Sequence, residues 1–128
     1  MNLYFAGVTV GIILIQTSIV APSLSKTLNR EDFGLAIRAI WPKFFLLVAA
    51  SGFGGVVSLW QSDDFSSVHM VIAGSTVFLS SVCYAIIPAT NRATDTGDER
   101  LFKRLHITSV LLTVAVLLGN IGVIAVNS

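Results

Sequence analysis

Hydrophobic residues occur in four long runs, and no charged residue interrupts any of them. The runs cover residues 3–21, 44–60, 68–88 and 105–126. A helix crosses the ~30 Å hydrocarbon core of a bilayer with about 20 residues, so each run is long enough to span it. Strands are excluded because the runs do not alternate and are about twice the length of a barrel strand. We predict an all-α integral membrane four-helix bundle, formed by one domain of residues 1–128.

Basic residues lie only in the segments between the first and second runs and between the third and fourth runs. With four crossings, these loops (residues 22–43 and 89–104, the second a polar connector) share one side of the membrane. The opposite side has only Asp63 and Asp64. The positive-inside rule therefore predicts cytoplasmic loops, both termini on the non-cytoplasmic side, and a location in a bacterial inner membrane. The basic residues are Lys26, Arg30, Arg38, Lys43, Arg92, Arg100, Lys103 and Arg104.

Prolines mark three of the predicted span ends. Proline lacks a backbone N–H and breaks a helix interior, so Pro22 and Pro88 are expected to end spans one and three. Pro42 is expected to open span two, where a missing amide costs little. Ser66 or Ser67 is expected to cap the start of span three.

The predicted membrane interfaces carry aromatic and basic residues. Trp41 and Trp60 fall at interfaces, where an amphipathic ring is favoured. Lys43 and Arg104 are expected to meet anionic lipid headgroups. The loop before Trp41 has the pattern of a short interfacial helix, with Asn29 as its N-cap.

Small residues recur at intervals of four in three spans. Such pairs let two helix backbones approach closely in lipid, where apolar side chains gain little by leaving the hydrocarbon. We expect these positions to pack helices together. They are Gly7 and Gly11, Ser51 and Gly55, and Ala115 and Gly119.

Two polar seams recur every seven residues along the last two spans. Seven residues make about two helical turns, so each set lies along one stripe of its helix. Hydrogen bonds between such stripes hold membrane helices together with about 0.6 kcal/mol each, and this interpretation is favoured over a polar pathway or pocket. The seams are His69, Thr76, Cys83 and Thr90, and His106, Thr113, Asn120 and Asn127; Gln16 is a further polar group at depth.

The two histidines are the candidate cofactor ligands. His69 begins span three and His106 begins span four on the opposite side, so roughly 25–30 Å of helix separates them. They cannot share a haem or a metal within one chain, and they remain candidates only as separate sites. No catalytic residue is predicted, because every Asp and Glu lies in a loop and no nucleophile–base motif is present. No metal site and no cofactor is predicted either.

Composition agrees with a membrane protein and narrows its partners. Charged residues make up 12% of the chain, against about 25% in soluble domains. The net charge of +1 and the absence of a basic stripe argue against nucleic acid.

The order of these features resembles the transmembrane protein 205-like family of four-span proteins. The matching elements are a glycine-rich first span ending at Pro22, an Asp-Phe-Gly in the first loop, an aromatic–proline–basic–aromatic entry to span two, and a Leu-His-x-x-Ser leading into the last span. Pro88 and Asn91 also match the exit of the third span. The residues of the other elements are Asp32, Phe33 and Gly34 in the loop, Trp41, Pro42, Lys43 and Phe44 at the entry, and Leu105, His106 and Ser109 before the last span. The family often has Asn where this chain has Thr113. The resemblance implies fold and topology, and no settled chemistry.

These features predict a small non-catalytic membrane protein. The leading hypothesis is an accessory, packing or assembly subunit of a larger membrane complex, with other membrane subunits as partners. The alternative is a module that binds or transports a small molecule, haem, quinone or metal, using the polar seams of spans three and four.

Overall fold

A computed structural model describes residues 3–63 and 66–127 of the chain, and these residues form long helices. The first run of helix is continuous but changes hydrogen-bonding pattern twice, from α to π and back to α. The elements are α1 (Tyr4–Ile15), the π-helical turn η1 (Gln16–Val20), α2 (Ala21–Thr27), α3 (Arg30–Trp60), α4 (Ser67–Asp95) and α5 (Glu99–Asn127).

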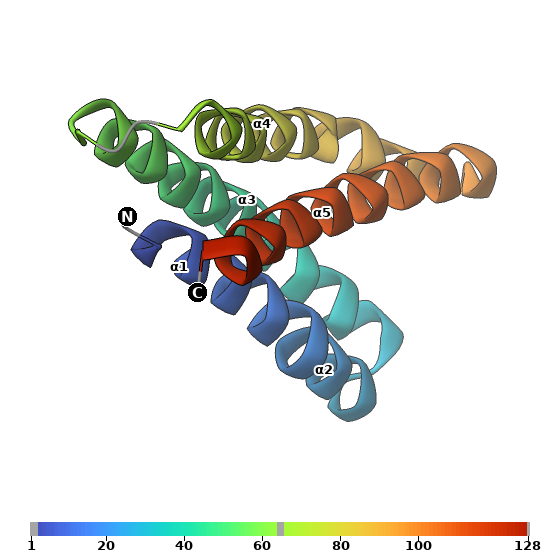
Figure 1. The fold of residues 1–128 in the computed structure, drawn as a ribbon. Coiled ribbons are helices and arrows are strands. Elements are labelled where there is room, and N and C mark those ends of the chain that lie inside the picture. The colour runs from blue at the N-terminus through green and yellow to red at the C-terminus, as the bar shows by residue number, and fades with distance from the viewer. Residues whose placement is uncertain (1–2, 64–65, 128) are drawn as a thin grey trace.

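The helices form an antiparallel bundle in which each packs against two neighbours. Helix α4 packs along α3 and α5, and α1 packs against α3 and α5. The N- and C-terminal ends lie near each other at one end of the bundle (Figure 1). The runs Tyr4–Thr27, Arg30–Trp60, Ser67–Asp95 and Glu99–Asn127 are each long and apolar enough to cross a membrane. The fold is therefore that of a multi-pass integral membrane protein, as the hydrophobic pattern predicts.

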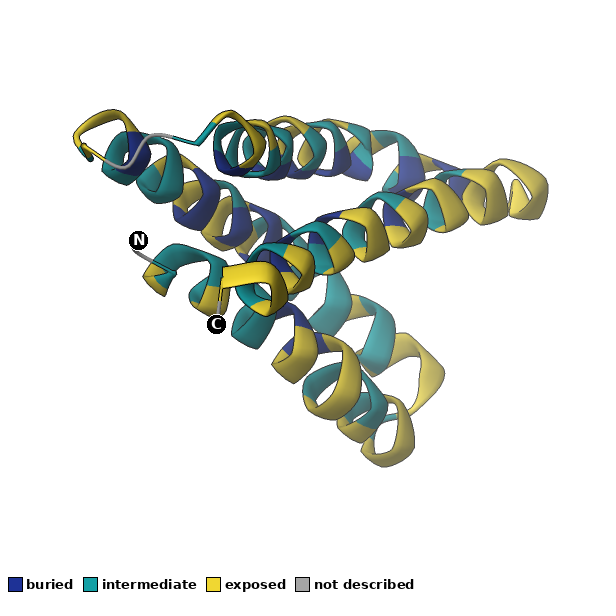
Figure 2. Ribbon diagram, in the orientation of Figure 1, coloured by how far each residue is buried: buried dark blue, intermediate teal, exposed yellow. Residues whose placement is uncertain are grey.

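The distribution of apolar and polar residues between surface and interior is the reverse of that in a soluble protein. Buried positions follow the facing sides of the helices, and exposed positions cover the outside (Figure 2). Many of the exposed positions are large and apolar, including Leu47, Phe53, Phe78 and Leu118, which are all more than half exposed. Extensive exposed apolar surface marks a contact with a membrane or with another protein, and on helices long enough to cross a bilayer it indicates lipid. The buried set, in contrast, contains many polar side chains: Thr9, Gln16, Ser51, His69, Thr76, Ser80, Thr90, Ser109 and Asn120.

The prolines do not end the helices, and this part of the sequence prediction is wrong. Pro42 and Pro88 lie inside α3 and α4, and the helix continues past Pro22 to Thr27. The π turn η1 ends two residues before Pro22 and contains Ser18, the residue whose carbonyl the proline ring would otherwise meet. Proline is tolerated within membrane helices because local π or 3₁₀ adjustments and neighbouring side chains satisfy the freed backbone groups.

The helices extend well beyond the apolar runs, so the predicted loops are largely helical. The segment before Pro42 is the first part of α3 rather than a separate interfacial helix, and the segment after Pro88 completes α4. Arg38 on α3 joins these extensions through an ion pair with Asp95 and a hydrogen bond to the carbonyl of Asn91 (3.3 Å) on α4. Charged residues thus marked where the apolar surface ends, not where the helix ends.

Two helix caps confirm the sequence prediction. The Oδ1 of Asn29 accepts a hydrogen bond from the Asp32 N–H at 2.7 Å, although the helix that it caps is the long α3. The Oγ of Ser66 accepts one from the His69 N–H at 3.5 Å at the start of α4. Each cap satisfies an amide that has no partner within the helix.

Candidate functional site

The two polar seams face each other across the α4–α5 interface. At the end of the bundle that holds the termini, Asn127 Nδ2 lies 2.7 Å from His69 Nε2. Seven residues further along α4, Asn120 Nδ2 donates to Thr76 Oγ1 at 2.9 Å. Each step of seven along α4 is therefore matched by a step of seven back along α5.

At the next step of the seams, Cys83 and Thr113 both donate to one backbone carbonyl. Cys83 Sγ donates to the carbonyl oxygen of Ser109 at 3.8 Å, and Thr113 Oγ1 donates to the same oxygen at 2.7 Å. Apolar residues including Ile13, Val48 and Val116 pack around Cys83 in the core. These interactions place the seams against each other as the contact between α4 and α5, rather than along an open path.

A cavity of ligand size lies elsewhere, between the first helical run (α1, η1 and α2), α3 and α5. We call it the His106 cavity; its volume is about 400 Å³. Small-molecule sites typically measure about 300–1,000 Å³. The walls are mainly apolar and aromatic, with polar groups at a few positions. They consist of Ile13, Gln16, Thr17, Ala21, Trp41, Phe44, Phe45, His106, Ser109, Val110, Thr113, Val114 and Leu117.

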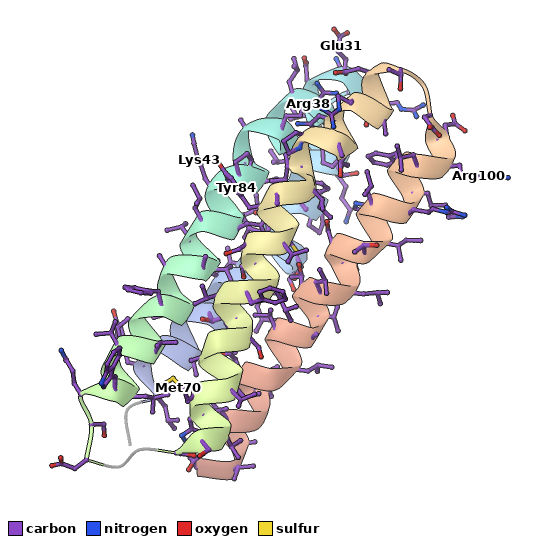
Figure 3. All side chains as sticks on the ribbon, turned by 90° about the horizontal axis from the view of Figure 1, so that it is seen from above. Glu31, Arg38, Lys43, Met70, Tyr84 and Arg100 are labelled. Atoms are coloured by element: carbon purple, nitrogen blue, oxygen red, sulfur yellow. The ribbon has the colours of Figure 1, made fainter. Side chains whose placement is uncertain are left out.

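The cavity lies where the helices separate. The α2 end of the first helical run and the first half of α5 diverge from each other (Figure 1). In Figure 3, Arg38 lies between α3 and α4, and Glu31 and Arg100 mark this end of the bundle, opposite Met70. The Arg38–Asp95 ion pair joins one side of this end, and the cavity occupies the other.

Gln16 contributes a polar side chain to the wall of the His106 cavity. It is 9% exposed, and its side-chain amide makes no hydrogen bond with any part of the chain that the structure describes. It is the first residue of the π turn η1. Single π turns occur frequently at functional sites because the extra residue re-aims the side chains beside it. Because the amide makes no hydrogen bond to the described residues, its N–H and C=O groups are available to a bound molecule.

His106 forms the second polar group of the cavity and lies between two aromatic rings. Its ring is parallel to that of Trp41, with centroids 5.6 Å apart and 9° between planes, and to that of Phe102, at 5.7 Å and 6°. Its Nδ1 is buried and has no hydrogen-bond partner among the described residues. Trp41 and His106 both line the cavity, and His106 brings an unsatisfied nitrogen to its wall.

His69 lines a different and much smaller cavity at the other end of the bundle. This His69 cavity has a volume of about 40 Å³ and is enclosed by residues of α1, α3, α4 and α5. The two candidate histidines are thus in separate sites, as their positions in the sequence imply. Among the described residues, no group of three or more His, Cys, Asp or Glu side chains is placed to hold a metal ion.

The predicted small-residue pairs divide into those that pack and those that do not. A Cβ added to Gly55 would lie 3.5 Å from Ala73 Cβ, and one added to Gly119 would lie 3.3 Å from Ile72 Cδ1. Ser51 Oγ lies 2.7 Å from Thr9 Oγ1, which joins α3 to α1.

The other three positions do not contact a second helix of the chain. A Cβ on Gly7 or Gly11 would meet no atom within 4 Å, and Ala115 is exposed. The prediction that these three positions pack within the bundle is wrong, because their spacing fixes a face of the helix but not what that face meets.

Three of the four predicted interface residues are exposed, and the fourth, Trp41, is partly buried. Trp60 is 80% exposed at the end of α3, and Lys43 and Arg104 are exposed. Lys43 points away from the bundle (Figure 3). Trp41 is partly buried against His106 and the core instead of projecting outward. The structure therefore moves Trp41 from the interface into the wall of the cavity.

Close-packing sites that sequence reasoning missed lie at Gly52 and Gly54. A Cβ on Gly52 would come within 2.8 Å of Thr76 Cγ2, and one on Gly54 would collide with the ring of Phe5. The run "SGFGG" signals a small-residue surface, but the choice among its glycines depends on the helix rotation. The His106 cavity itself was also missed, since its walls come from three separate spans.

The described residues define the class of the protein: an all-helical membrane protein with four helices that are long and apolar enough to cross a bilayer. Residues 4–99 match the family model described as a domain of unknown function, DUF4149, and the chain belongs to that family. No curated protein and no solved structure matches the chain.

Proposed function

We propose that the protein binds a lipid-soluble small molecule in the His106 cavity, a molecule with a flat ring and a hydrogen-bonding head group. The observation that carries this proposal is His106 Nδ1, a buried nitrogen with no hydrogen-bond partner among the described residues, in the wall of a cavity of about 400 Å³. Ring-bearing lipids of the quinone class have this chemistry. Their carbonyl oxygens accept hydrogen bonds from amide and imidazole N–H groups.

The walls of the cavity support this choice of ligand. The aromatic rings of Trp41, Phe44 and Phe45 in the cavity wall can pack against another ring. The Thr113 hydroxyl already donates to the backbone carbonyl of Ser109, so toward a ligand it can only accept. Gln16 and His106 are therefore the groups that would orient the ligand.

The test is to identify what the protein carries when it is purified from its native membrane in mild detergent. Bound small molecules would be extracted, identified by mass spectrometry, and measured by absorbance against protein concentration. We expect a ring-bearing lipid in the wild-type protein and about tenfold weaker binding in Gln16→Leu, since one lost hydrogen bond of ~1.4 kcal/mol corresponds to a factor of ten.

Matched variants separate binding from folding. His106→Asn should reduce binding, whereas His69→Asn, at the other end of the bundle, should retain it. A Soret band that depends on His106 would identify the ligand as haem instead of a quinone. A wild-type protein without any bound small molecule, or equal losses in His106→Asn and His69→Asn, would refute the proposal.

A second candidate function is that of an accessory or assembly subunit in a larger membrane complex. It is supported by Gly7 and Gly11 on α1, where an added Cβ would meet no atom of the described residues within 4 Å. Glycines at this spacing let a second helix approach closely. Gly7→Leu should release a co-purifying membrane partner, whereas Gly122→Leu, at a similarly open position on α5, should not. A wild-type protein that leaves native membrane alone would count against this candidate.

We also propose an orientation, a location and a closer relationship. The eight basic residues at the end opposite the termini support a cytoplasmic position for that end in a bacterial inner membrane. Membrane-impermeant labelling of cysteines at Lys26 and Arg100, in a Cys83→Ala background, should reach both from the cytoplasmic side alone. The Leu105, His106 and Ser109 pattern, beyond the matched residues 4–99, supports a place among transmembrane protein 205-like proteins.

A further inference from the structure

The His69 cavity is lined by hydrogen-bonding groups from all four membrane-crossing segments. Thr9 comes from α1, Ser51 from α3, His69 from α4 and Asn120 from α5. Each of these side chains is at least nine-tenths buried. Such groups are stable in a bundle interior only when their hydrogen-bonding capacity is used.

The proton on the His69 ring can be placed from the bonds of Asn127. The Nδ2 of Asn127 donates to the Val123 carbonyl at 2.8 Å, and a carbonyl can only accept, so this atom is the amide nitrogen. The same nitrogen lies 2.7 Å from His69 Nε2, which must therefore accept. In a neutral imidazole the other nitrogen then carries the proton. His69 Nδ1–H is thus a buried donor, and it has no partner among the described residues.

The other side chains of the cavity present acceptors. Both N–H bonds of Asn120 are used, by Thr76 Oγ1 and by the Val116 carbonyl, which leaves its Oδ1 to accept. The hydroxyls of Thr9 and Ser51 lie 2.7 Å apart, and each lies 3.0 Å from the carbonyl of Phe5. One hydroxyl donates its proton to that carbonyl and the other hydroxyl donates to the first. Each hydroxyl can therefore only accept a further hydrogen bond.

We propose that the His69 cavity binds water, which accepts a hydrogen bond from His69 Nδ1–H and donates to Asn120 Oδ1 and a neighbouring hydroxyl. The volume of about 40 Å³ is sufficient, because one water requires about 10–15 Å³ and two to four polar partners. A cation would face the Nδ1–H with no carboxylate in the lining, and an anion would face oxygens whose protons are already used. Only a molecule that both donates and accepts fits, and this inference does not depend on the function of the His106 cavity.

Two measurements on the full-length protein test this proposal. The ¹⁵N shifts of the His69 ring, obtained through its carbon-bound protons, report which nitrogen is protonated. A crystal structure at a resolution that shows ordered water reports the content of the cavity. We expect the Nδ1–H tautomer and a water within hydrogen-bonding distance of both Nδ1 and Asn120 Oδ1.

Variants on α4 provide the control. Ala73→Leu places a larger side chain in the cavity wall and should remove the water, whereas Gly74→Ala, whose Cβ would meet no atom within 4 Å, should retain it. An Nε2–H tautomer, or the Nδ1–H tautomer beside a cavity with no water density, would overturn the proposal. Density coordinated as a metal ion would also overturn it.

Discussion

Gly52 holds α3 and α4 at their closest approach, and Gly52→Ala tests whether this contact limits stability. The added Cβ would lie 2.8 Å from Thr76 Cγ2, 3.0 Å from Thr76 Cβ and 3.1 Å from Val77 Cγ2. Thr76 cannot simply rotate away. It is 1% exposed, and its hydroxyl donates to the Ile72 carbonyl and accepts from Asn120.

The expected cost follows from these contacts. The α3 and α4 backbones must separate until the methyl groups reach an ordinary contact of at least 3.4 Å. Overpacking of this kind typically costs about 1–3 kcal/mol. The separation also strains the Asn120–Thr76 hydrogen bond, worth about 0.6 kcal/mol. We therefore expect Gly52→Ala to lower the free energy of unfolding by about 2 kcal/mol.

The assay is reversible unfolding in mixed micelles, followed by far-ultraviolet circular dichroism as the fraction of denaturing detergent rises. Gly7→Ala is the matched control, because a Cβ there meets no atom within 4 Å. It should leave stability unchanged or raise it slightly, since alanine favours the helix. If Gly52→Ala is as stable as the wild type, or if Gly7→Ala loses as much, the assignment of Gly52 as the close contact is refuted.

Three further predictions concern single sites. A double-mutant cycle of Thr76→Val and Asn120→Ala should give a coupling of about 0.6 kcal/mol in the same unfolding assay, and zero coupling would show that the seams do not bond. Gly97→Ala should destabilise the fold by about 1 kcal/mol or more, because Gly97 has a φ of +73°; an unchanged unfolding midpoint would contradict this backbone geometry. Cys83, which is 1% exposed, should react with a maleimide only after denaturation, and rapid labelling of the folded protein would show that the core is open.

The spacing of residues along single helices predicted the features that depend on one helix at a time. The four spans, the Asn29 and Ser66 caps and the separate positions of the histidines needed only length and local hydrogen bonding. The seams also follow from spacing, since one set repeats every seven residues on α4 and the other on α5.

Features that depend on how helices rotate against each other were not predictable in this way. Gly7 and Gly52 are both glycines in apolar helices, yet only Gly52 meets another helix. Trp41 was expected at the interface from its position beside Pro42, but the rotation of α3 turns it toward His106. The π turn that begins at Gln16 has no spacing signal, because it changes the rotation of the helix without interrupting its apolar run.

The regular seven-residue repeat of the seams leaves the alignment of α4 and α5 ambiguous. Sliding one helix past the other by seven residues, about 10 Å, would set His69 opposite Asn120 and Thr76 opposite Thr113. The short turn that contains Gly97 prevents this displacement, because residues 96–98 are all that connect the two helices. Seven residues inserted into that turn would relax the restraint and should yield a mixture of two alignments, distinguishable by disulfide trapping between engineered cysteine pairs.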